Sequence, residues 1–118
     1  MADVRVQVFG RKDSRETGRA LRFYKERRVE VAFVDLGVRP MAPTELRRFA
    51  ERLGAEPLID REGKRFRELG LAWIQMDDQD LLRRLLADQR LLRLPLIRRG
   101  DAFAAGVDEA DWRRLLSG

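Results

Sequence analysis

The 118-residue chain contains no cysteine and no histidine. Their absence excludes disulfides, thiolate nucleophiles, the usual zinc sites and acid–base catalysis by imidazole. The groups left for chemistry are carboxylates, lysines, hydroxyls and a single tyrosine, Tyr24. We therefore expect neither a metal site nor a cofactor.

Long apolar runs are also missing. No stretch approaches the roughly 18 apolar residues that a membrane span needs, and the polar N-terminus does not resemble a signal peptide. We therefore expect a cytoplasmic protein without membrane contact. The length suits one domain with a single core, which we expect to span residues 1–118.

Charge is abundant but dispersed. The chain carries 25 Lys and Arg against 20 Asp and Glu, a net charge of +5. Cations alternate with acids, as in Lys25-Glu26-Arg27, which is typical of solvated helix faces. Nucleic-acid-binding proteins normally concentrate their basic residues in one patch. We therefore expect no direct nucleic-acid binding.

The N-terminal third has the pattern of a strand, a helix and a second strand. Valines alternate with polar residues over residues 4–8 and predict a strand that ends at Gly10. Apolar residues at helical spacing predict a helix to about residue 28, and alternation over residues 29–33 predicts the next strand. A single helical crossover favours a parallel strand pair with a right-handed connection.

The start of the first helix has two candidate caps. Either Asp13 or Ser14 can serve as the N-cap residue. Glu16 lies three residues after Asp13, which is the spacing of a capping box.

Three helices are expected next, between residues 41 and 90. The first ends at Gly54, the second ends at Gly70, and the third begins at Asp77 or Asp78. We expect Trp73 in this segment, and Trp112 near the C-terminus, to lie in the core or under a lid rather than to form exposed anchors.

The C-terminal segment has the pattern of a hairpin and a helix. Residues 94–98 predict a strand, Gly100-Asp101 a turn and residues 102–104 the returning strand. Asp108 then opens the last helix. The expected order is therefore β-α-β, three helices, β-β-α.

Four segments in this order resemble the arsenate reductase-like (ArsC/Spx) branch of the thioredoxin fold. They are Phe9-Gly10 with the turn at Ser14, Pro57-Leu58-Ile59 followed by residues 66–71, residues 91–97, and residues 105–108. The resemblance covers nearly the whole chain. It implies an α/β (α+β), thioredoxin/glutaredoxin-like fold with a four-stranded mixed sheet and a helical insertion at about residues 41–90.

The resemblance also implies that the redox site has been lost. The family's catalytic cysteine corresponds to Ser14, and the second cysteine of some members corresponds to Thr17. The three arginines that hold the oxyanion in arsenate reductases correspond to Asp60, Asp80 and Leu94. A serine would also need a general base, and no histidine is present. We therefore expect no arsenate reductase activity and no catalytic residue.

Pro95 matches the cis-proline of thioredoxin folds, which faces the active-site loop. In the family this proline leaves a backbone edge free to receive a peptide or glutathione. We expect Ser14, Arg15 and Pro95 to contribute to ligand binding. The alternatives are that Pro95 serves only the geometry of the fold and that Ser14 is only a helix cap.

Two functions fit these features. The first is a non-catalytic scaffold that binds a protein partner through the old active-site face or the helical insertion. Because Spx-like members bind RNA polymerase, the resemblance implies a transcription-linked partner. The second is binding or transfer of glutathione or a small anion, with Ser14 as hydrogen-bond donor and Arg11, Lys12 and Arg15 attracting the ligand. An engineered cysteine-to-serine variant of an active reductase is disfavoured, because the arginines are missing as well.

Overall fold

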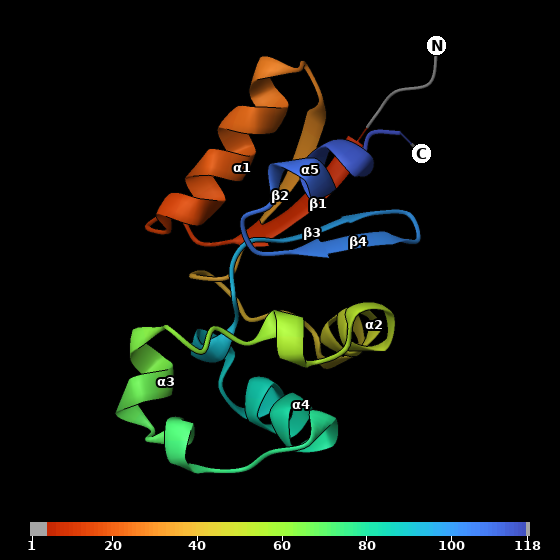
Figure 1. Cartoon of the computed structure of the whole chain (residues 1–118). Helices are drawn as coiled ribbons and strands as arrows, with labels where there is room; N and C mark the ends of the chain where they lie inside the picture. Colours follow the sequence, from red (N-terminus) through yellow and green to blue (C-terminus); the bar gives the residue numbers. More distant parts are fainter. Residues whose placement is uncertain (1–4, 118) are drawn as a thin grey trace. The chain divides into compact units, whose positions relative to one another are not determined.

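The structure is a computed structural model that describes residues 5–117. The chain forms two compact units (Figure 1). Residues 1–40 and 94–118 make the first, which we call the sheet unit, and residues 41–93 make the second, which we call the helical unit.

The sheet unit is built on four strands: β1 (Arg5–Gly10), β2 (Glu30–Asp35), β3 (Leu96–Arg99) and β4 (Ala102–Ala105). Their order is β2-β1-β3-β4. β1 and β2 are parallel, whereas β3 is antiparallel to both β1 and β4. The predicted mixed sheet and its parallel pair are confirmed. Val4, which begins the predicted first strand, lies outside the described residues.

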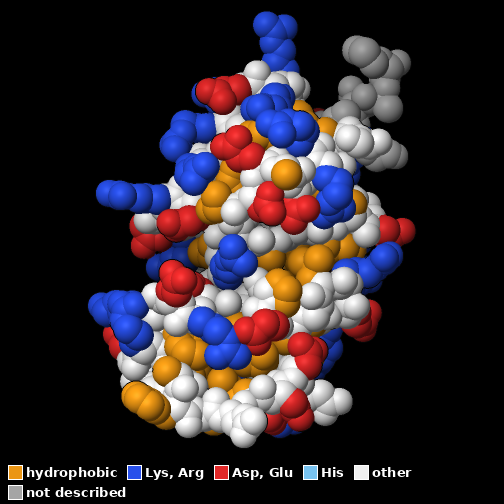
Figure 2. Space-filling model, viewed as in Figure 1, with side chains coloured by type: hydrophobic (Ala, Val, Ile, Leu, Met, Phe, Trp, Pro, Cys, Tyr) orange, Lys and Arg blue, Asp and Glu red, His pale blue; other side chains and the backbone are white. Residues whose placement is uncertain are grey.

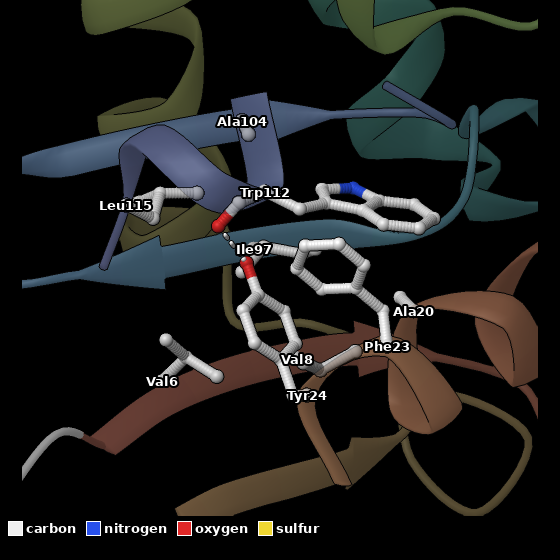
Figure 3. Close-up of a cluster of buried hydrophobic side chains, with 9 residues drawn as sticks. All are labelled: Val6, Val8, Ala20, Phe23, Tyr24, Ile97, Ala104, Trp112 and Leu115. Carbon is white, nitrogen blue, oxygen red and sulfur yellow. Dashed lines mark hydrogen bonds between the residues drawn. The ribbon is translucent and has the colours of Figure 1, made fainter. Parts of the chain in front are cut away.

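Two helices of the sheet unit, α1 (Arg15–Glu26) and α5 (Glu109–Arg114), contribute to its core. Figure 3 shows their aromatic side chains packed against the strands. The Tyr24 hydroxyl donates a hydrogen bond of 2.9 Å to the Trp112 carbonyl oxygen, joining α1 to α5. Burial raises the pKa of the Tyr24 phenol. The buried cluster consists of Val6, Val8, Ala20, Phe23, Tyr24, Ile97, Ala104, Trp112 and Leu115.

The helical unit contains the three predicted helices, α2 (Pro43–Leu53), α3 (Lys64–Glu68) and α4 (Asp78–Ala87). α2 begins with proline, whose fixed φ suits a first helical position, and ends at Gly54, which has a φ of 81°. Asp77 and Asp80 form a reciprocal capping box at the start of α4. Three 3-10 helices complete the unit: η1 (Glu56–Leu58), η2 (Leu71–Trp73) and η3 (Gln89–Leu91).

Two predicted boundaries are wrong by about two residues. α1 ends at Glu26, because Arg28 adopts a left-handed conformation with φ 58° and Val29 N–H closes back on the Tyr24 carbonyl at 3.0 Å. β3 begins at Leu96, since Pro95 has no N–H to donate to a ladder. The Leu94–Pro95 peptide bond is cis.

The two tryptophans differ in burial. Trp112 is fully buried, as predicted, but the prediction for Trp73 is wrong because its side chain is 93% exposed. Both residues have apolar neighbours in the sequence, so the spacing of apolar residues does not predict which of the two side chains is buried. η2 is a tight turn that follows Gly70 in a left-handed conformation, and Leu71 takes its buried position while Trp73 points outward.

A close backbone approach fixes the start of α1 against the end of β1. A Cβ atom added to Gly10 would lie 2.4 Å from Oγ1 and 2.9 Å from Cβ of Thr17. Thr17 is fully buried. Rotation of the threonine side chain cannot relieve the contact with its Cβ, so glycine is required at position 10 for steric reasons.

We predict opposite effects for two glycine-to-alanine substitutions. Gly10→Ala should destabilise the protein because β1 and α1 must separate, with a cost of about 1–3 kcal/mol, typical of overpacking. Gly18→Ala should stabilise it by about 0.5–1 kcal/mol, because Gly18 lies inside α1 and the nearest atom to an added Cβ is 3.5 Å away. Urea unfolding of both variants measures the two changes. A Gly10→Ala protein as stable as wild type would contradict this view of the turn.

Asp88 joins α4 to η3 in the helical unit. Its carboxylate accepts hydrogen bonds from the Arg90 backbone N–H at 3.0 Å and from Arg90 Nε at 2.9 Å, and it also pairs with Arg65. The hydrogen bond from the Arg90 side chain is the largest of the effects that hold the pKa of Asp88 at about 2.

We therefore predict that the benefit of Asp88 depends on pH. Because its folded-state pKa lies below the ordinary value of about 3.9, its stabilisation is complete above about pH 4 and is lost as the pH falls through about 2. The difference in the free energy of unfolding between wild type and Asp88→Asn should shrink over this range in urea titrations. Asp13→Asn removes a more exposed ion pair and should have a smaller effect. A difference that stays constant down to pH 2 would contradict the prediction.

Candidate functional site

The loop between β1 and α1 places Ser14 at the N-cap of α1. Ser14 has an extended backbone with φ −88°, and its Oγ accepts a hydrogen bond of 3.1 Å from the Thr17 N–H. The hydroxyl in turn donates to Glu16 Oε1 at 3.3 Å. The structure thus selects Ser14, and not Asp13, as the cap. The capping box predicted between Asp13 and Glu16 is not formed, because Ser14 is the cap residue and Glu16 Oε1 accepts a hydrogen bond from the Ser14 hydroxyl instead.

This geometry does not activate the Ser14 hydroxyl as a nucleophile. The group that accepts its hydrogen bond is the exposed carboxylate of Glu16. Activated serines normally rely on histidine or lysine as the base, and the chain contains no histidine.

Thr17 occupies the third position of α1 and is fully buried. Its Oγ1 accepts a hydrogen bond of 3.3 Å from the Arg11 backbone N–H, so the side chain holds the loop in place. Ser14 and Thr17 are therefore brought together by the helix start, and both hydroxyls have structural partners there.

A hollow of about 490 Å³ lies beside Ser14 along the first turns of α1. It is lined by Lys12, Asp13, Ser14, Arg15, Gly18, Arg19 and Arg22. The sequence analysis identified Lys12 and Arg15 but missed Arg19 and Arg22. Their spacing from Arg15, four and seven residues, places all three arginines on one face of a helix and was the available signal.

The cations around this hollow differ in their partners. Lys12 lies 4.0 Å from Asp35, and Arg19 lies 3.3 Å from Glu109. Within residues 5–117, Arg15 and Arg22 form no ion pair. The hollow therefore has an excess of positive charge beside a helix N-terminus, which favours anions.

The acid in the hollow, Asp13, is paired with a cation outside it. Arg11 Nε lies 3.2 Å from Asp13 Oδ1. Its hydrogen bond and its charge hold the pKa of Asp13 below the ordinary value.

Pro95 lies next to this loop in the register of the sheet. β1 and β3 are paired through Phe9 and Leu96. In this antiparallel register Gly10, which follows Phe9, lies opposite Pro95, which precedes Leu96. The Pro95 carbonyl accepts a hydrogen bond of 2.9 Å from Gly106 N–H. No hydrogen bond of the Leu94 main chain is found among the described residues. Within residues 5–117, the Leu94 backbone unit therefore has no hydrogen-bond partner.

The two acids aligned with oxyanion-binding arginines have local structural roles. Asp60 Oδ1 accepts a hydrogen bond of 3.2 Å from Glu62 N–H and shapes the turn before α3. Asp80 accepts from Asp77 N–H at 3.1 Å and pairs with Arg83, and these contacts lower its pKa, the backbone hydrogen bond most strongly. Both carboxylates are therefore used within the helical unit.

The carboxylates of residues 5–117 form no group that could hold a metal ion. None of the described helices is long and apolar enough to span a membrane.

Solved structures similar to this one include proteins described as ArsC-related or as arsenate reductases. A protein named YffB matches with a TM-score of 0.85 and 21% identity over 94% of this chain and 98% of its own. An ArsC family related protein from Bacteroides fragilis matches with a TM-score of 0.84 and 15% identity, over 97% and 99%. An arsenate reductase from Vibrio cholerae matches with a TM-score of 0.77 and 13% identity, over 98% of both chains. At these identities, the similarity shows the fold: an α/β, thioredoxin-like arrangement.

Sequence comparison gives the family. No curated protein matches the chain. The sequence model of the ArsC family matches residues 11–115, which include the Ser14 loop, the helical unit and α5. The chain is therefore a member of the ArsC family, with a thioredoxin-like fold and without cysteine.

Proposed function

We propose that this ArsC-family protein is a non-catalytic scaffold that binds a protein partner. The observation that carries the proposal is how the Ser14 hydroxyl is hydrogen-bonded. Its hydroxyl caps α1 and donates to Glu16, in a chain that has no cysteine to attack an oxyanion and no histidine to activate a serine. A redox or acyl-transfer reaction at this helix start has no nucleophile.

A backbone binding edge supports the choice of a protein partner. The Leu94 main chain has no internal hydrogen bond among the described residues, and it precedes the cis bond to Pro95. An extended peptide could pair with this backbone unit by the β-type hydrogen bonds that chains use to recognise one another. The resemblance to Spx favours a transcription-linked partner, acting in the cytoplasm.

The second candidate function is binding of glutathione or another small anion. The excess charge of Arg15 and Arg22 in the hollow beside Ser14 favours it. In this reading the Ser14 hydroxyl would leave Glu16 and donate to the ligand's thiolate or carboxylate. Pro95 and the Leu94 backbone would then hold the peptide part of the ligand.

The domain organisation that we propose is a single domain over residues 1–118 with a helical insertion at about 41–90. The compactness of residues 41–93 supports an insertion of this length. Both candidate functions place their binding residues in the sheet unit, at the Leu94 backbone or in the hollow beside Ser14.

Arsenate turnover tests the absence of catalysis. With glutathione and glutaredoxin present, we expect no turnover by wild type. Ser14→Cys should also be inactive, because the positions aligned with the oxyanion arginines are Asp60, Asp80 and Leu94. Turnover by wild type would overturn the non-catalytic proposal. Turnover by Ser14→Cys alone would show that the anion-binding positions are intact and were misaligned.

A calorimetric titration with glutathione separates the two candidate functions. A protein scaffold should show no saturable heat. If there is a glutathione site, the heat should saturate, and the affinity should fall at least tenfold in Ser14→Ala and in Arg22→Gln. The affinity should also fall as salt is added, because salt screens a charge interaction. Lys25→Gln removes a cation from the far end of α1 and is the matched control.

Ser14→Ala should also lower the free energy of unfolding by about 1 kcal/mol through loss of the cap.

A further inference from the structure

The helical unit exposes an apolar surface around Trp73. The Trp73 side chain is 93% exposed, and those of Ile74 and Leu69 are 43% and 36% exposed. Figure 2 shows hydrophobic side chains at the surface of this part of the chain. Tryptophan is the residue type most enriched among interface anchors, and grouped exposed apolar residues mark interaction sites.

A hollow follows directly on this surface. It has a volume of about 380 Å³ and is lined by Ile74, Gln75, Met76, Asp80, Arg83, Arg84 and Ala87. The four α4 residues among them have the spacing i, i+3, i+4, i+7, so they form one stripe along the helix. The neighbouring stripe, with Leu81 and Leu85, is buried. α4 therefore presents a groove that ends at a small residue, Ala87.

Charge changes sign along α4. Its start carries Asp77 and Asp78, and its second half carries Arg83 and Arg84. Arg83 is paired with Asp80 inside the stripe, whereas Arg84 forms no ion pair within residues 5–117. Two such helices attract one another when they lie antiparallel and repel one another when they lie parallel.

We propose that this face binds a second copy of the chain. The two α4 helices lie antiparallel about a two-fold axis near Asp80. Each Trp73 enters the hollow of the other copy, where its ring packs on Ala87 and stacks on the guanidinium of Arg84. Each acidic α4 start then faces the arginines of the other copy.

A second copy fits this face better than an unrelated partner does. The protruding ring and the hollow share a boundary at Ile74, so one surface carries both halves of the contact. This is the requirement of an isologous interface, in which residue i meets residue j and j meets i. The charges of α4 are also self-complementary, because in an antiparallel pair the acidic start of each helix meets the basic half of the other.

Sedimentation equilibrium of the full chain tests the proposal between about 10 μM and 1 mM. We expect a reversible monomer–dimer equilibrium whose dissociation constant rises at least tenfold in Trp73→Ser, in Arg84→Glu and in Ala87→Glu. Val38→Ser is the matched control, because Val38 is 80% exposed but lies in the sheet unit. A monomer at 1 mM would overturn the proposal, and so would a dimer that Trp73→Ser leaves intact.

The orientation of the helices has its own test, because the chain has no cysteine and each introduced thiol is unique. Near the two-fold axis a residue meets its own copy, so Asp80→Cys should form an intermolecular disulfide under mild oxidation. Ala87→Cys lies away from the axis and should not. Cross-linking of both variants would indicate parallel helices and overturn the antiparallel arrangement, as would cross-linking of Ala87→Cys alone.

Discussion

The contact between Gly10 and Thr17 is the constraint on which the sheet unit depends. It allows the last residue of β1 to lie against the first turn of α1. The Thr17 hydroxyl accepts the Arg11 N–H, and the Thr17 N–H donates to Ser14, so the loop is hydrogen-bonded at both ends of the turn. α1 then presents Phe23 and Tyr24 to the sheet, where Tyr24 reaches the Trp112 carbonyl of α5 (Figure 3). A misplaced helix start would displace this whole layer.

The same helix start can keep its geometry when a hydroxyl takes the place of a thiol. A helix N-terminus favours negative charge whether the residue at its cap is a thiol or a hydroxyl. A thiol in this position ionises readily and becomes a nucleophile. A serine at the cap keeps its proton, and its hydrogen bonds serve the stability of the helix. The hollow beside Ser14 is lined by several cations, which attract an anion whichever group caps the helix.

The helical unit uses its charged residues differently. Asp77 and Asp80 act within one turn of their own position, as a capping box and as a partner of Arg83, and Asp88 caps η3 and also pairs with the more distant Arg65. The short-range contacts among these determine where α4 begins and ends. The stripe along α4 remains at the surface, and the exposed Trp73 lies beside it. The Trp73 ring therefore contributes little to packing within its own chain.

The sequence by itself determined the order of elements, because alternation and helical spacing are local signals. It also predicted the parallel β1–β2 pair, the stops at Gly54 and Gly70, and the absence of thiol and imidazole chemistry. The resemblance located the helix start, and the structure indeed places Ser14 at the N-cap of α1 with Arg15 beside it. The arginine stripe that continues to Arg22 was also present in the spacing, although it was overlooked.

Only the tertiary structure decided which of two similar residues is buried and which of two possible caps is used. Trp73 and Trp112 have comparable apolar neighbours, but Trp112 faces a sheet whose strands come from distant parts of the chain, and Trp73 follows a tight turn that buries Leu71 instead. Asp13 and Ser14 are both favourable N-cap residues. Which one caps α1 depends on the path of the loop between the end of β1 and the start of the helix. Burial and helix entry depend on contacts between residues far apart in sequence, which local periodicity does not encode.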